Sequence, residues 1–175
     1  MISFNKLLFI ILCTINLNAN NFQNIKSFEA KFTQTIKNPS GTKVFYNGTI
    51  HIKEPYLVLW QYKKPIEKLV YIKKYTITII EPELEQAIVT KLDKEINILE
   101  LLKNATLISE NTYLSKFNNV EYTVTLKNDI LNSISYKDEL ENSVNINFKD
   151  VRQNHKIDEE IFKFVIPYEY DLIKK

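Results

Sequence analysis

The stretch at residues 48–87 constrains the fold most, because it contains four short apolar runs separated by polar turns. Ile50 and Ile52 alternate with polar neighbours, which is the period-two pattern of a strand with one buried face. Pro55 and Pro65 interrupt the pattern. The runs that follow are rich in β-branched and aromatic side chains and span residues 56–62, 69–72 and 75–80. Closely spaced strands joined by tight turns predict an antiparallel meander.

The same alternation predicts strands in the rest of the chain. Residues 28–36 form one predicted strand, and turn residues at 38–41 allow residues 44–53 to pair back on it as a hairpin. Further predicted strands lie near residues 105–109, 112–117, 121–127, 130–137 and 143–149. The sequence therefore predicts a mainly β domain with short helices, of the α+β class.

Helices are few. Apolar residues at helical spacing predict a helix at residues 94–103, and a short amphipathic helix is predicted at residues 20–27. Asp158 starts a single predicted turn. Two short helices cannot cover one face of some ten strands. A sheet covered so incompletely is expected either to dimerise or to hold an apolar ligand.

The N-terminus has the pattern of an export signal. Lys6 precedes an apolar stretch at residues 7–15, and Ala19 offers a small residue for cleavage. The alternative is a membrane anchor, but the apolar stretch is much shorter than the roughly 20 residues needed to cross a bilayer. We therefore predict a removed signal peptide at residues 1–19 and one domain at residues 20–175.

Cys13 is the only cysteine and lies within the predicted signal. After cleavage the domain has no thiol, disulfide or cysteine metal site, so core burial alone must stabilise it. A lipidated Cys13 is the alternative, but Leu12 is bulky where lipoprotein processing favours a small residue.

The composition gives little reason to expect nucleic acid as a partner. The 22 lysines and single arginine nearly balance 21 acidic residues, leaving a formal net charge of +2. The densest group of lysines comprises Lys63, Lys64, Lys68, Lys73 and Lys74. These side chains either blunt strand edges as solvated turn lysines or form a docking patch for an acidic partner or an anionic membrane.

The sequence shows no arrangement typical of a catalytic centre. Only two glycines are present, which excludes a Gly-rich phosphate loop. His51 is predicted on the solvent face of its strand and His155 in a polar turn, which argues against a metal pair. Glu81, Glu83 and Glu85 fit an acidic loop after a strand. We therefore predict a binding protein rather than an enzyme, with no cofactor and no metal.

Three segments carry a family resemblance. The pattern S-F-x-A-x-F-x-Q is matched by Ser27, Phe28, Ala30, Phe32 and Gln34. Residues 48–87 then hold a Gly, a Lys-Glu-Pro, a Trp five residues after that Pro, a second Pro and a Glu-Pro-x-x-x-Gln. The motif F-x-F-x-x-P is matched at residues 162–167. Together these segments resemble the periplasmic outer-membrane lipoprotein carrier family (LolA).

The resemblance implies both a fold and a function. The fold would be an incomplete antiparallel β-barrel, or strongly curved sheet, with a helical lid over an apolar cavity. The protein would be a monomeric periplasmic chaperone that carries triacylated lipoproteins. Its partners would be an ATP-driven inner-membrane exporter as donor and, as recipient, an outer-membrane acceptor or the outer membrane itself.

The predicted acyl-chain cavity combines inward-facing strand positions with the helical stripe. Its candidate residues are Ile50, Ile52, Tyr56, Val58, Trp60, Tyr62, Ile77, Ile79, Leu99 and Leu102. Glu54 is the candidate lid latch, because the family usually has an arginine there, which is thought to latch the lid by hydrogen bonds. A carboxylate accepts where guanidinium donates, so Glu54 needs different lid partners. A plain solvent-facing turn residue is the alternative for this position.

The sequence is compatible with other functions. An outer-membrane lipoprotein acceptor, or another periplasmic lipid-binding protein, would share the fold, and an acceptor would require a lipidated cysteine. A secreted hydrolase would need a nucleophile and base, and an adhesin would expose a large aromatic patch. The mature N-terminus distinguishes the carrier from the acceptor.

Overall fold

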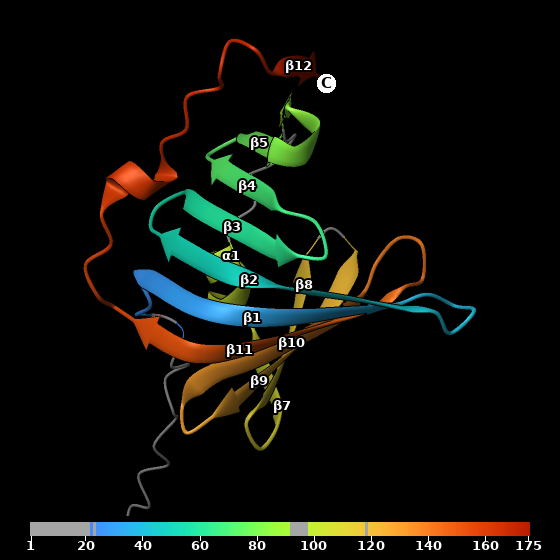
Figure 1. Cartoon of the computed structure of the whole chain (residues 1–175). Coiled ribbons are helices and arrows are strands. Elements are labelled where there is room, and N and C mark those ends of the chain that lie inside the picture. The colour runs from blue at the N-terminus through green and yellow to red at the C-terminus, as the bar shows by residue number, and fades with distance from the viewer. Residues whose placement is uncertain (1–21, 23, 92–97, 118) are drawn as a thin grey trace, which may run out of the picture.

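The computed structural model describes residues 22, 24–91, 98–117 and 119–175, which form one sheet of twelve strands (Figure 1). The strands are β1 (Ser27–Lys37), β2 (Lys43–Lys53), β3 (Leu57–Lys64), β4 (Lys68–Lys73), β5 (Thr76–Glu81), β6 (Gln86–Lys91), β7 (Thr106–Ser109), β8 (Thr112–Phe117), β9 (Val120–Lys127), β10 (Ile130–Lys137), β11 (Ser143–Gln153) and β12 (Asp171–Lys174). The helical segments are α1 (Ile98–Lys103) and the 3-10 turns η1 (Pro82–Leu84) and η2 (Glu159–Phe162). The fold is therefore mainly β, as the sequence predicted.

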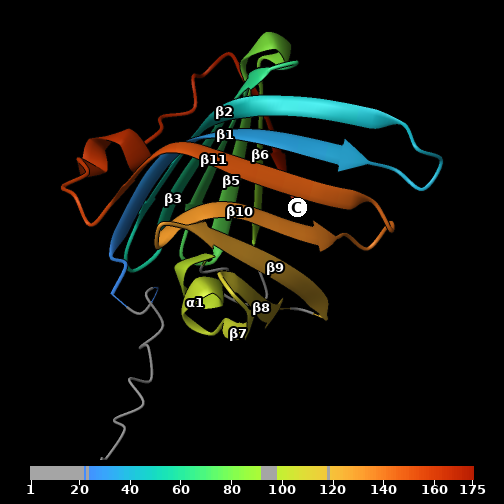
Figure 2. The ribbon, with the colours of Figure 1, turned by 90° about the horizontal axis from the view of Figure 1, so that it is seen from below.

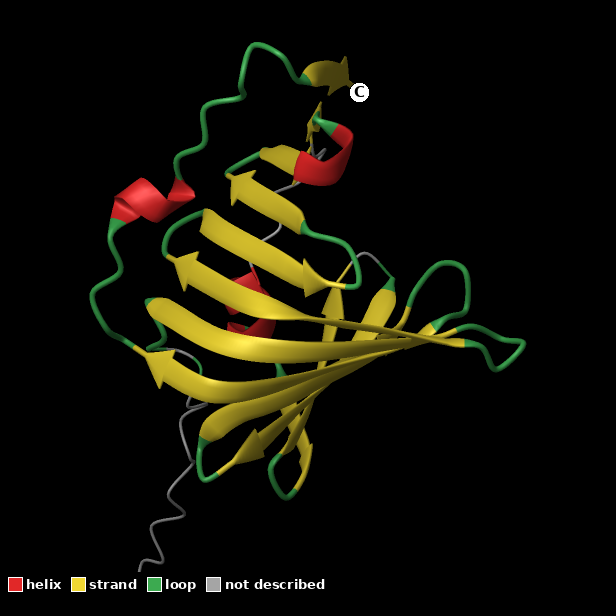
Figure 3. Ribbon diagram, in the orientation of Figure 1, coloured by secondary structure: helices red, strands yellow, loops and turns green. Residues whose placement is uncertain are grey.

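Two antiparallel meanders meet at the centre of the sheet. Strands β2 to β6 form one and β7 to β11 the other, and β1 joins them by pairing with both β2 and β11. The sheet curls strongly but stays open, with β7 at one edge and β12 at the other (Figures 2 and 3). Its concave face holds α1, which is the only α-helix among the described residues.

The described residues correct several predicted elements. The helix predicted at residues 94–103 is present from Ile98, and its earlier part lies outside the described residues, as does the predicted signal at residues 1–19. The helix predicted at residues 20–27 is wrong in its described part, where the Ile25 amide donates to the Phe22 carbonyl at 3.3 Å within a turn. Strands β6 and β12 were not predicted.

Local turn chemistry explains the tight connections of the second meander. Asn128 and Asp129 both have positive φ, 52° and 61°, which suits the two-residue turn between β9 and β10. Between β10 and β11, the Asp138 carboxylate accepts the amides of Leu140 and Asn142, each at 2.9 Å. These polar residues form turns that the sequence had indicated.

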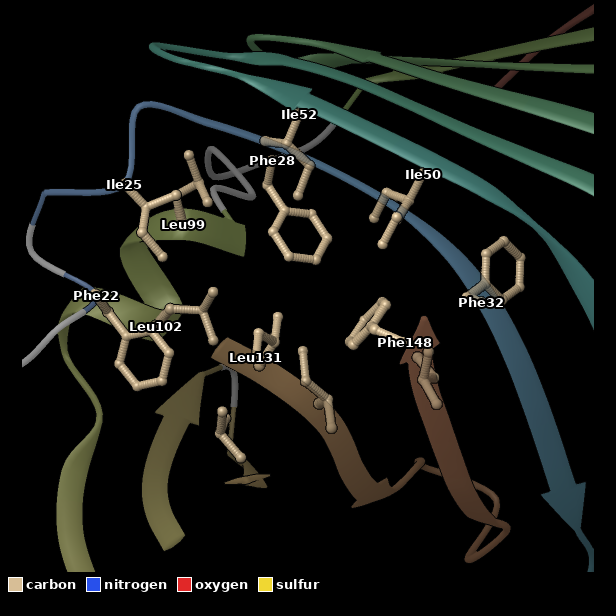
Figure 4. Close-up of a cluster of buried hydrophobic side chains, with 14 of the residues drawn as sticks. Phe22, Ile25, Phe28, Phe32, Ile50, Ile52, Leu99, Leu102, Leu131 and Phe148 are labelled. Carbon is tan, nitrogen blue, oxygen red and sulfur yellow. The ribbon is translucent and has the colours of Figure 1, made fainter. Parts of the chain in front are cut away.

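Alternation along the strands places the core on the concave face. In β1, Phe28, Ala30 and Phe32 are buried, whereas Lys31 and Thr33 are exposed. Inward-facing residues from both meanders meet beneath α1 (Figure 4). The buried cluster comprises Phe22, Ile25, Phe28, Ala30, Phe32, Ile50, Ile52, Val58, Leu99, Leu102, Val124, Leu126, Leu131, Ile134, Val144, Ile146 and Phe148.

The C-terminal segment covers part of the convex face. After β11 the chain leads into η2, which lies beside β3, and then reaches β12, which pairs in parallel with β6 (Figure 1). Ile157 and Phe162 form a second buried cluster with Leu59 of β3. Within the described ranges, no helix has the length and apolar character needed to cross a membrane.

Candidate functional site

A pocket of about 180 Å³ lies between α1 and the concave face of the sheet. Its wall is almost entirely apolar, and the polar side chains among the described residues that line it are those of Trp60, Tyr122 and Tyr136. The lining residues are Phe28, Ile50, Ile52, Trp60, Leu101, Leu102, Phe117, Tyr122, Leu131, Ile134, Tyr136, Ile146 and Phe148. Both meanders and α1 contribute to it, so the pocket exists only because the sheet curls.

Four of the predicted cavity residues line this pocket: Ile50, Ile52, Trp60 and Leu102. Strand pairing explains the grouping, because Ile50 lies opposite Trp60 and Ile52 lies opposite Val58. Val58 and Leu99 are buried in the core cluster beside the pocket, at 3% and 1% exposure.

Tyr62 packs beside the pocket within an aromatic group. Its ring stacks on Trp60 with centroids 6.2 Å apart, and Phe32 meets both rings edge-on at 5.2 Å. Burial raises the pKa of the Tyr62 hydroxyl, as it does for Tyr136 across the pocket. Both hydroxyls are therefore neutral at physiological pH.

Ile77 and Ile79 share the inward face but lie outside the pocket. Ile77 lies opposite Ile72 of β4. Ile79 lies opposite Val70, and Val70 lies opposite Trp60, so these three residues form one cross-strand row over β5, β4 and β3. Both side chains are partly exposed. They extend the apolar concave face beyond the pocket.

The strand predicted at residues 56–62 begins one residue later in the structure, and Tyr56 is not part of it. The turn after Pro55 extends through Tyr56, so β3 begins only at Leu57. Tyr56 is 36% exposed, and its carbonyl accepts the Lys74 amide at 3.3 Å. Period-two phase alone could not show that this position belongs to a turn.

The pocket residues of the second meander, and Leu101 of α1, were not predicted as site residues. In the second meander, Leu131, Ile134 and Tyr136 all lie on β10. The alternation in residues 130–137 was visible in the sequence, but nothing in it showed that this strand would face β3 across a pocket.

Glu54 lies in the turn after β2 and pairs with Lys103, the last residue of α1. Both side chains are half-buried. The preceding residue points to the other side of the sheet, where the Lys53 Nζ donates to Glu159 of η2 at 2.8 Å. One turn therefore holds α1 on the concave side and the C-terminal segment on the convex side.

The two histidines meet on the convex face rather than in the pocket. The Glu29 carboxylate lies 3.0 Å from the His155 Nε2 and 3.9 Å from the His51 Nε2, and it also pairs with Arg152. Burial lowers the pKa of His51, although Glu29 opposes this effect. Across the part of the chain that the structure describes, no three His, Cys, Asp or Glu side chains are arranged to hold a metal.

These features define a class of protein: an open, curled antiparallel sheet with an apolar pocket on its concave face. A solved LolA superfamily protein from Nitrosomonas europaea shares the fold, with a TM-score of 0.51 at 10% identity over 83% of this chain and 94% of that one. An uncharacterised conserved protein from Thermus thermophilus gives a TM-score of 0.53 at 8% identity, over 91% and 96%.

Sequence comparison identifies the family. The model of the outer membrane lipoprotein carrier protein LolA matches residues 23–120. The outer-membrane lipoprotein carrier protein of Campylobacter jejuni is 38% identical over 151 residues, which are 86% of this chain and 88% of that protein. The protein of the same name from Wolinella succinogenes is 35% identical over 155 residues, covering 88% and 90%. This chain belongs to the LolA family.

Proposed function

We propose that this protein accepts acylated lipoproteins released from the inner membrane and carries them through the periplasm to the outer membrane. The observation that supports this most directly is the apolar pocket between α1 and the sheet, in a chain whose relatives are named lipoprotein carriers. The pocket shields acyl chains, and α1 is its lid.

The small volume of the pocket is our reason to expect that the lid opens. At about 180 Å³ the pocket is smaller than the roughly 300–1,000 Å³ typical of sites for drug-sized ligands. Acyl chains therefore enter only when α1 moves away from the sheet. Opening joins the pocket to the partly exposed apolar face of β4 and β5, where Ile72, Ile77 and Ile79 lie.

Incomplete burial suits a carrier that must release its cargo. Each buried methylene contributes about 0.8 kcal/mol, so full burial of three acyl chains would exceed the strongest non-covalent affinities. An open trough holds part of each chain and leaves the rest accessible. Loading and release then need an energy source outside this chain, as an ATP-driven exporter in the inner membrane would provide, with an outer-membrane acceptor or the membrane itself as recipient.

Export to the periplasm depends on residues 1–19, which we propose are removed as a signal peptide. Mass spectrometry of the exported protein is expected to find a free N-terminus near Asn20. A lipid-modified Cys13 at the mature N-terminus would instead support the acceptor.

Trp60 provides a direct test of acyl binding, because it is the only tryptophan and lines the pocket. A triacylated lipopeptide should change its fluorescence, since acyl chains replace the protein atoms and solvent around the indole. The same peptide without acyl chains is the control and should leave the emission unchanged. An indole that does not respond to saturating lipopeptide would contradict the proposed site.

The Glu54–Lys103 pair is expected to control the lid with little effect on stability. Reversing one charge with Glu54→Lys places two lysines together and should favour the open lid, so lipopeptide binding and transfer change. The free energy of unfolding should shift by only about 0–1 kcal/mol, as for other partly exposed ion pairs.

The charge-swapped variant provides the decisive comparison. Glu54→Lys combined with Lys103→Glu should restore native transfer, because the pair forms again with reversed polarity. The Lys53–Glu159 pair is a matched control on the convex side, and Lys53→Met should not alter transfer. Native transfer by both Glu54→Lys and Glu54→Ala would show that Glu54 is an ordinary turn residue.

A further inference from the structure

Trp60 is the one tryptophan of the chain, and its side chain lines the pocket. The Nε1 of Trp60 is buried and has no hydrogen-bond partner among the described residues. Buried polar groups in native proteins are nearly always paired, since an unpaired one loses its hydration without compensation. The indole N–H therefore needs an explanation that the packing of the free protein does not provide.

Packing holds the indole in place. Phe32 meets the ring edge-on at 5.2 Å, and Tyr62 stacks on it at an interplanar angle of 15°. Its cross-strand neighbours are Ile50 and Val70, which have no side-chain acceptor. A phenylalanine here would supply an aromatic surface without a buried donor. Tryptophan adds a donor that is buried beside the pocket, and a ligand reaches it only when the side chains around it move.

The chemistry of the pocket restricts what this donor can bind. An indole N–H donates and never accepts, so its partner must be an acceptor. Among the described residues, no lysine, arginine or histidine lines the pocket, so a free carboxylate would lack a cationic partner there. A neutral carbonyl oxygen meets both conditions, and one joins each acyl chain of an acylated lipid to its head through an ester or amide.

We propose that the Trp60 Nε1–H donates a hydrogen bond to the ester or amide carbonyl of a bound acyl group. This inference rests on the proposed carrier function and adds a specificity to it. The pocket would select ester- and amide-linked acyl chains over ether-linked chains and free fatty acids. The carbonyl would fix the head of one chain at β3, while its tail lies against Ile52, Phe28 and Phe148 of the same pocket.

The test compares two short-chain lipids that differ only in the carbonyl: dioctanoyl glycerol, with ester links, and dioctyl glycerol, with ether links. The native protein should bind the ester about three- to tenfold more tightly, the factor expected of one neutral hydrogen bond. In protein labelled with ¹⁵N at the indole, the single tryptophan gives one N–H resonance. The ester should shift this resonance downfield and the ether should not.

Variants separate the donor from the ring. Trp60→Phe should still bind both lipids, measured by calorimetry, but with equal affinity. Tyr71→Phe is the control, because it also removes a polar hydrogen from an aromatic side chain. Tyr71 lies on β4 and packs on the convex face against the cluster of Leu59, Ile157 and Phe162, away from the pocket. This variant should keep the ester preference. Should Trp60→Phe fail to fold, the affinity ratio and indole shift of the native protein decide the question.

The outcomes distinguish this inference from the proposed function. Equal affinity of the native protein for ester and ether, or an ester preference that survives Trp60→Phe, would overturn the carbonyl site while leaving acyl binding intact. Failure of the native protein to bind either lipid would contradict both proposals.

Discussion

Replacing Gly48 with alanine is expected to destabilise the protein by about 3 kcal/mol or more, at the upper end of overpacking substitutions. Gly48 lies in β2 between Phe32 of β1 and Tyr62 of β3, where the pairing with β3 shifts register. A Cβ added there would collide with the Gln61 carbonyl oxygen and lie 2.9 Å from a ring carbon of Phe32. Relieving the collision requires the strand to move, because backbone cannot rotate away as a side chain can.

Chemical denaturation with circular dichroism measures this effect. Gly41→Ala is the matched control, because a Cβ at Gly41 meets nothing within 4 Å. Its φ of +94° makes alanine strained there, so we expect a loss of about 1–2 kcal/mol from backbone strain alone. If the two substitutions destabilise the protein equally, the close contacts of Gly48 with Gln61 and Phe32 are not the reason that this position needs glycine.

Fixing α1 against the sheet is expected to reduce lipopeptide binding about tenfold or more. Glu54→Cys with Lys103→Cys places two thiols where the native side chains form an ion pair, and a short bis-maleimide would join them. If α1 is the lid that we propose over this pocket of about 180 Å³, affinity falls with the fraction of molecules that can still open. No other cysteine competes once residues 1–19 are absent.

The effect should depend on the link and not on the substitutions. The double variant without the linker should bind lipopeptide at least as well as the native protein. Joining Lys53→Cys to Glu159→Cys instead fixes η2 on the convex side and should leave binding unchanged. A fully linked Glu54–Lys103 variant that binds normally would show that α1 is not the lid.

Much of the inner face could be predicted from local sequence alone. Side chains alternate across a strand whatever its partners are, so the patterns at residues 28–34 and 49–53 identified the buried side of β1 and of the second half of β2. Pro55 marked the end of β2, and the motifs at residues 27–34 and 48–87 indicated the family that the comparisons confirm.

Local patterns could not indicate which distant segments meet. Glu54 and Lys103 are 49 residues apart, and only the curl of the sheet places α1 over the turn after β2. On the convex face, Asp150 has a φ of +53° where the β1–β11 register shifts, and beyond the shift Arg152 lies opposite Glu29. Bulges, sheet curvature and the parallel pairing of β12 with β6 depend on contacts between segments remote in sequence. The sequence by itself determined which side chains face inward along β1 and the second half of β2, whereas the pocket, its ion-paired helix and the buried indole N–H of Trp60 depend on how the two meanders curl towards each other.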